Sequence, residues 1–279
     1  MILRNRFITF WIAILIVVFA GCTKTPKTTK TSILDRVAVT GASVTAGHGL
    51  STPPIKGDLG AYPVNMKHIM EGIITAPHDD VEYFGELMFF LNPRAHAKKF
   101  VKEINDYEPT LLIAVDFLFW FGHGTPPQDV NVATYRMKKM HFALDLLDQL
   151  NCKIIVGNLP NIQSAIGKIL SKRQVPTPEL LVQLNERIEE WGRSKSNVTV
   201  IDANRLWDLV INDKEVTVFG STWPAGSRDV LLQQDMLHLT LEGTVAASLL
   251  AAEAIAVEGL ETNPKIIMKR AAAAARKDQ

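Results

Sequence analysis

The sequence predicts an α/β fold in which helices cover both faces of a mainly parallel sheet. Short apolar runs recur along the chain, and segments with the three-to-four-residue apolar spacing of helices lie between them. Strands that alternate with helices in this way form β–α–β units, whose strands run parallel. The 279 residues suffice for one domain with tails, and the 47% hydrophobic share allows a sizeable core.

Five apolar segments are predicted to be strands: residues 37–40, 81–84, 111–115, 153–156 and 198–201. The third is apolar throughout, which is typical of a strand buried on both faces. Side chains that act on ligands gather at the carboxyl ends of parallel strands. We therefore expect one functional edge of the sheet to carry the residues that follow these segments, namely Gly41, Ala42, Ser43, Asp116, Asn158 and Asp202.

Four longer segments have helical spacing of their apolar residues: 95–107, 130–150, 179–192 and 241–257. Residues 215–227 interrupt the alternation and are interpreted as an insertion, such as a hairpin, that either flanks a site or packs on the sheet edge. The sequence places a folded domain at 35–260. Residues 261–279 are interpreted as a basic C-terminal tail. Its Ala-rich end at 269–279 is either a basic helix or a frayed end, and a solvated terminus is favoured.

The N-terminal residues 1–21 predict a secretory signal segment. Arg4 and Arg6 precede an apolar run that is too short to span a bilayer comfortably. Ala20 and Gly21 followed by Cys22 resemble the lipobox of bacterial lipoproteins, although Phe19 stands where Leu is usual. This resemblance implies lipidation of Cys22 and an extracytoplasmic, membrane-anchored protein. The alternatives are a plain signal peptide cut elsewhere and an uncleaved anchor. Residues 22–34 are predicted to be a disordered tether, because the stretch is rich in Thr and Lys.

Charge and cysteine content exclude several classes of protein. The net charge of +1 argues against nucleic acid as a partner. Cys152 has no partner except Cys22, so an internal disulfide is not expected, and we interpret Cys152 as a buried apolar residue. HExxH and CxxC patterns are absent, and neither a metal nor a cofactor is expected. The remaining histidines, interpreted as surface or core residues, are His48, His68, His78, His96, His123 and His141.

Ser43 follows the first predicted strand and is a candidate nucleophile. A serine hydroxyl needs a neighbouring base to attack a carbonyl at neutral pH. Gly41 permits a tight turn out of the strand, and a helix that starts there would direct its first N–H groups at an oxyanion. The alternative is that Ser43 only caps a helix.

Asp235 and His238 supply the base and the residue that orients it. Their separation of three allows both side chains to lie on one face of a turn. Asp235 would then fix the imidazole tautomer and leave the other ring nitrogen to accept the Ser43 proton. The alternative is that Asp235 caps the following helix.

Together these motifs resemble the SGNH hydrolase superfamily of GDSL-type esterases and lipases. Gly41-Ala42-Ser43 matches the family's Gly-Asp-Ser block, Asp235-Met236-Leu237-His238 matches its Asp-x-x-His block, and the likeness extends over residues 36–257. It implies a three-layer α/β/α sandwich of SGNH/flavodoxin-like type with about five mostly parallel strands. It also implies that Ser43 is the nucleophile, His238 the base and Asp235 the orienting residue.

The chain departs from the family pattern at the groups that bind the oxyanion. Ala42 replaces the Asp of the first block, and Asp116 stands where the family carries an Asn donor. An ionised Asp116 would repel an oxyanion. The Ser43 N–H, Gly85 and Asn158 are the candidate donors that remain, and Asn158 follows a more distant strand.

Asp116 and Trp120 are candidates to line the substrate site. Four aromatic residues follow the third predicted strand, and at least half of them are expected in the core: Phe117, Phe119, Trp120 and Phe121.

The resemblance implies a serine esterase that cleaves ester or O-acetyl bonds through an acyl-enzyme. A small ester, an acylated glycan or a lipid would be its substrate. The alternative is a non-catalytic SGNH-fold lipoprotein that binds a partner or acts structurally. The missing Asn favours this alternative, and the retained Ser, His and Asp disfavour it. A nucleotide-binding loop at residues 41–49 matches neither GxGxxG nor the P-loop.

Overall fold

The computed structural model describes residues 32–52 and 60–279. The predicted signal segment, Cys22 and most of the predicted tether therefore lie outside the described residues. Leu34, at the end of that tether, is instead buried in the core with 1% of its surface exposed. Among the described residues, no helix combines the length and apolar character needed to cross a bilayer.

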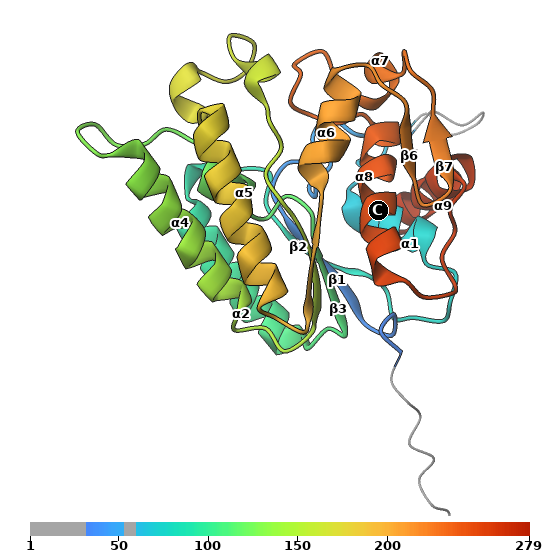
Figure 1. Cartoon of the computed structure of the whole chain (residues 1–279). Helices are drawn as coiled ribbons and strands as arrows, with labels where there is room; N and C mark the ends of the chain where they lie inside the picture. The colour runs from blue at the N-terminus through green and yellow to red at the C-terminus, as the bar shows by residue number, and fades with distance from the viewer. Residues whose placement is uncertain (1–31, 53–59) are drawn as a thin grey trace, which may run out of the picture. The chain divides into compact units, whose positions relative to one another are not determined.

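Five parallel strands form the central sheet (Figure 1). They are β1 (Val37–Gly41), β2 (Glu82–Gly85), β3 (Leu111–Ala114), β4 (Lys153–Gly157) and β5 (Val198–Ile201). Their order is β2-β1-β3-β4-β5. The chain adds β2 on one side of β1 and the later strands on the other side, so the topological switch point lies between β1 and β3. The crevice outside the carboxyl ends of the strands at such a switch point is where open α/β sheets bind ligands.

Helices cover both faces of the sheet, which confirms the predicted three-layer α/β/α architecture (Figure 1). On one face lie α2 (Pro93–Tyr107), α4 (Val132–Leu147) and α5 (Pro178–Arg193). On the other lie α1 (Met66–Ile73), α8 (Leu241–Ile255) and α9 (Pro264–Lys277), and α6 (Ala203–Ile211) contacts α8.

Three of the long helices begin at a polar residue whose side chain accepts a hydrogen bond from the first turn. Asn92 and Thr177 each accept a hydrogen bond from a first-turn N–H, and each precedes a proline at the first helical position. Asn131 likewise starts α4 at Val132, two residues later than predicted. The predictions missed the short helices α1, α6, α3 (Phe119–Gly122) and α7 (Arg228–Leu231).

The predicted insertion at 215–227 contains a two-stranded antiparallel hairpin of β6 (Val216–Val218) and β7 (Ser221–Trp223). It contacts α8, and the Trp223 indole donates a hydrogen bond of 2.9 Å to Glu242. The hairpin thus packs on a helix of the outer layer.

The predicted solvated tail at 261–279 requires a correction, because most of it forms α9, which packs along α1. Ile267, Ala271 and Ala275 recur every four residues and are fully buried, so small side chains let the two helices approach closely. A Cβ built at Gly72 of α1 would lie 2.6 Å from the Ile267 carbonyl oxygen. The alanine-rich stretch is therefore a contact surface of the folded domain.

Replacing Ala271 by Leu is expected to lower the free energy of unfolding by about 1–3 kcal/mol, because the larger side chain has no room between α9 and α1. Ala273→Leu is the matched control, since Ala273 is exposed on the same helix. Urea unfolding of both variants checks the expectation. Equal stability of the two would contradict the packing of α9.

Candidate active site

The turn after β1 holds Ser43 at the switch point of the sheet. Ala46 N–H donates to the Ala42 carbonyl over 2.8 Å, and His48 N–H donates to the Ser43 carbonyl over 2.9 Å. These bonds close one turn, which ends because Gly47 has a φ of +70°. Ser43 therefore does not cap a helix, and the alternative role of a helix cap is wrong. The expectation that a helix starts directly after Gly41 is wrong as well.

Asp116, which follows β3, fixes this turn from the neighbouring strand. Its carboxylate accepts the backbone N–H groups of Ala42 (3.0 Å), Val44 (2.8 Å) and Thr45 (3.4 Å), and the Thr45 hydroxyl (2.6 Å). A Cβ at Gly41 would lie 2.0 Å from this carboxylate, which explains the glycine. Burial raises the pKa of Asp116, and the hydrogen bonds offset part of that rise.

These bonds change the role expected for Asp116. The sequence suggested a residue that lines the substrate site or repels an oxyanion, whereas in the structure the Asp116 carboxylate holds the turn that carries Ser43. Both neighbours of Ser43 donate their N–H groups to Asp116. Among the described residues, the Ser43 N–H itself has no hydrogen-bond acceptor. It stays free to donate to an oxyanion.

Asp235 and His238 form a hydrogen-bonded pair in a tight turn before α8. Asp235 Oδ2 lies 2.6 Å from His238 Nδ1, and Asp235 Oδ1 accepts the N–H groups of Leu237 and His238, each over 2.9 Å. Burial alone would raise the pKa of Asp235, but these hydrogen bonds outweigh it and lower that pKa. Thr240 caps α8 in place of Asp235, so the capping alternative is wrong.

Ser43 and His238 line one pocket, although no hydrogen bond joins their side chains in the described structure. Hydrogen bonds between catalytic side chains are often long without substrate and tighten when it binds. Trp120 lines this pocket, in line with its predicted place, whereas Phe117 and Phe121 are buried in the core. The three residues of the predicted set are thus gathered at the switch point of the sheet.

The two further oxyanion candidates differ in position. Gly85 ends β2 and pairs with Gly41 of β1, so it lies beside the strand that leads to Ser43. Asn158 does not line the Ser43 pocket, which requires a correction. Its Nδ2 donates to Asp202 over 3.0 Å and its Oδ1 accepts the Asn204 N–H over 2.8 Å, so the amide joins β4 to the start of α6.

His48 is a residue of the pocket that the sequence interpretation missed. Its ring centroid lies 4.0 Å from that of His238. Burial and the nearby His238 lower the pKa of His48, and Asp235 acts in the opposite direction. His48, Asp235 and His238 each offer a potential metal-ligand atom, and these atoms lie within 4.8 Å of one another. The sequence did contain one signal for this role: His48 lies five residues after Ser43, between two glycines, in the loop that follows the first strand.

The lowered pKa of His48 predicts a loss of stability in acid. The unfolded chain binds a proton at His48 near its ordinary value of about 6.5, before the folded chain does, so stability falls as pH falls through this range. His48→Gln should reduce the difference in unfolding free energy between pH 7.5 and pH 5. Exposed His141→Gln is the control. Identical pH dependence of the two variants in urea unfolding would contradict the expectation.

Exposed apolar side chains form one wall of the Ser43 pocket. Leu87, Met88, Phe90 and Ile169 line the pocket, and each is more than 40% exposed. Phe89 anchors this segment because its side chain is fully buried. Apolar residues gathered around a pocket mark a surface that contacts apolar ligands. We name Leu87, Met88, Phe90 and Ile169 the apolar rim.

Cys152 is buried, as predicted, and lies away from the pocket. Burial raises the pKa of its thiol to about 11, so the thiol is protonated and unreactive at neutral pH.

Comparison with known proteins gives structural neighbours only. No family model matches the sequence, and no curated protein matches it. A solved structure described as a GDSL-like lipase from Parabacteroides merdae aligns with 79% of this chain and 95% of its own, at 12% identity and a TM-score of 0.49.

Two further structures align less closely. A gut microbial diltiazem-metabolizing enzyme aligns with 79% of this chain and 46% of its own, at 13% identity and a TM-score of 0.45. The salicylyl-acyltransferase SsfX3 from a tetracycline biosynthetic pathway aligns with 83% of this chain and 57% of its own, at 14% identity and a TM-score of 0.42. At this level of similarity, the functional argument depends on the geometry of the site.

Proposed function

We propose that this chain is a serine esterase of the SGNH type. The observation that carries the proposal is the Asp235–His238 pair, bonded over 2.6 Å in the turn before α8, with His238 facing the same pocket as Ser43. In this reaction Ser43 Oγ attacks the ester carbonyl while His238 accepts its proton. The alcohol leaves with that proton, and a water molecule then cleaves the acyl-enzyme by the same route.

The Ser43 N–H is the main oxyanion donor in this proposal, because Asp116 holds the turn on both sides of it. Gly85 is proposed as a second donor from the end of β2. Loss of one such donor typically lowers the rate by about 10²–10³. We therefore expect slower turnover than in an SGNH enzyme that also has the Asn side-chain donor, whose place Asp116 takes here.

The apolar rim supports an ester with an apolar acyl or alcohol group as the substrate. Leu87, Met88 and Phe90 are exposed at the pocket mouth, where water would otherwise contact them. Burial of such surface by substrate contributes about 25 cal/mol per Å². A lipid, an acylated glycan with an apolar acyl group or a small apolar ester meets this requirement.

We also propose that lipidation of Cys22 anchors the protein outside the cytoplasm. The short apolar run and the Ala20-Gly21-Cys22 sequence support this proposal. Cys22→Ser should move the protein from the membrane fraction to the soluble fraction. Retention of the variant on membranes would contradict a lipid anchor.

The test of the esterase is hydrolysis of p-nitrophenyl acetate and butyrate by a chain that starts at residue 27. Turnover that disappears in Ser43→Ala, together with a fluorophosphonate adduct mapped to Ser43 by mass spectrometry, is the expected result. Ser227→Ala is the matched control and should keep its activity. Absence of both turnover and labelling in the folded parent would contradict the proposal.

A non-catalytic SGNH-fold binding protein is the second candidate. One observation favours it: Asn158 is engaged by Asp202 and Asn204, and the family's Asn position is occupied by an acid that holds the turn. Failure of fluorophosphonate to label a folded protein would select this candidate.

A further inference from the structure

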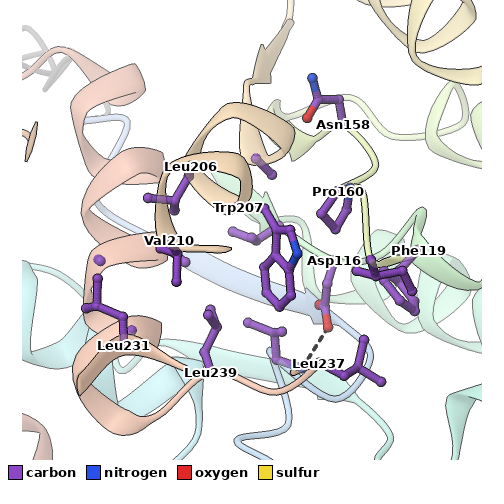
Figure 2. A pocket seen from close by; sticks show the side chains of 17 residues that line it. Asp116, Phe119, Asn158, Pro160, Leu206, Trp207, Val210, Leu231, Leu237 and Leu239 are labelled. Carbon is purple, nitrogen blue, oxygen red and sulfur yellow. Dashed lines mark hydrogen bonds between the residues drawn. The ribbon is translucent and has the colours of Figure 1, made fainter. Parts of the chain in front are cut away.

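A second cavity lies beside the Ser43 turn, between α6, α8 and the carboxyl ends of β3 and β4 (Figure 2). Its volume is about 60 Å³. The walls are almost wholly apolar, with Leu206, Trp207 and Val210 from α6 and Ala246 and Ala247 from α8. Neither Ser43 nor His238 lines it.

One polar group in this wall has no partner. Trp207 is 6% exposed, and its indole N–H donates to no acceptor in the described structure. Buried N–H groups are nearly always hydrogen-bonded in native proteins, so an orphan donor at a cavity wall indicates a missing acceptor. Figure 2 shows the indole ring among the lining side chains, with its nitrogen on the edge toward Asp116.

Asp116 restricts the chemistry of that acceptor. Its carboxylate lines the cavity and already accepts hydrogen bonds from the Ser43 turn. A negatively charged ligand would meet this acid in an apolar surrounding, where repulsion is strong. The small volume, about the space of a few water molecules, excludes bulky rings and fits a slender chain.

We propose that this cavity is a second ligand site, which binds an unbranched alkyl chain with one uncharged oxygen acceptor bonded to the Trp207 N–H. A ketone, an ester or an alcohol has this chemistry, and a carboxylate does not. The site is distinct from the Ser43 pocket and does not depend on hydrolysis. Leu237 lines both cavities, so the occupant contacts the turn that carries His238.

The test is calorimetric titration of 2-heptanone into Ser43→Ala, in a chain from residue 27 whose cooperative unfolding has been verified. Ser43→Ala lacks the proposed nucleophile, so the titration measures binding alone. The binding result can therefore be interpreted even if the esterase proposal fails. We expect saturable binding with one ligand per chain. Trp207→Phe keeps the ring and removes the donor, and should weaken binding about tenfold, the loss typical of one neutral hydrogen bond.

Two further variants locate the ligand. Ala247→Leu fills the cavity and should abolish binding, and Ala246→Val serves the same purpose if Ala247→Leu does not fold. Leu87→Ala alters the other pocket and should leave binding unchanged. Heptanoate at pH 8 should bind at least tenfold more weakly than 2-heptanone. Absence of binding, equal affinity in Trp207→Phe, or sensitivity to Leu87→Ala alone would overturn the proposal.

Discussion

Asp235→Asn is expected to lower kcat by about 10⁴ while the protein remains folded, as loss of the acid does in Ser-His-Asp triads. The Asn carbonyl oxygen can still accept the backbone N–H groups of Leu237 and His238, so the turn persists. In the parent, the Nδ1–H of His238 donates to Oδ2 of the Asp235 carboxylate. The side-chain amide of Asn would instead donate to His238 Nδ1. His238 would then carry its proton on the nitrogen that must accept from Ser43.

The measurement is kcat for p-nitrophenyl butyrate, with Asp229→Asn as the matched control because Asp229 is highly exposed. Thermal unfolding of Asp235→Asn should stay within a few degrees of the parent. Turnover within tenfold of the parent would rule out Asp235 as the residue that orients His238.

Asp116→Asn is expected to lower the free energy of unfolding by about 3 kcal/mol and to reduce turnover as well. The carboxylate accepts four hydrogen bonds from the Ser43 turn. An amide has one oxygen, so its NH₂ group would face at least one backbone N–H, and hydrogen bonds to a charged acceptor contribute about 1.5–3 kcal/mol each. The substitution introduces the residue that the GDSL-type motif carries at this position, yet we expect it to lower both stability and turnover.

Thr45→Val is the graded control for this prediction. It removes the hydroxyl, and with it the 2.6 Å bond to Asp116 and a longer 3.4 Å bond to the Thr40 carbonyl, while the backbone N–H bonds to the carboxylate remain. It should cost about 1 kcal/mol in urea unfolding. Higher esterase activity of Asp116→Asn would show that residue 116 faces the oxyanion and would contradict the role described above.

The sheet was predictable because its central strands are buried. Every residue of β1 and β3 is buried, and the sequence there is apolar except for Thr40. Helices α1 and α6 were missed because they are short: each spans only two or three turns, less than the window of about 11–18 residues over which helical spacing is judged. At the C-terminal end, a helix was one of two interpretations, and the solvated terminus was wrongly preferred. Alanine gives little apolar contrast, although the buried positions of α9 recur every four residues.

The candidate site was predictable where its parts are close in sequence. Asp235 and His238 are three residues apart, and their hydrogen bond follows from that spacing. The role of Asp116 depends on contacts with residues more than 70 positions earlier, which one sequence does not reveal. The contact of His48 with His238 spans 190 positions and was missed for the same reason.

The contact between α1 and α9 has a consequence for the order of folding. The Met66 N–H at the start of α1 donates to the Thr45 carbonyl over 3.0 Å, so α1 braces the Ser43 turn. Because α9 packs on α1 and Asp278 accepts from Lys67 over 2.8 Å, this brace is complete only when α9 has docked. The Ser43 turn thus depends for its full support on a segment that lies far later in the sequence. Contacts so distant in sequence slow folding, so we expect the Ser43 turn to be among the last parts of the domain to become rigid.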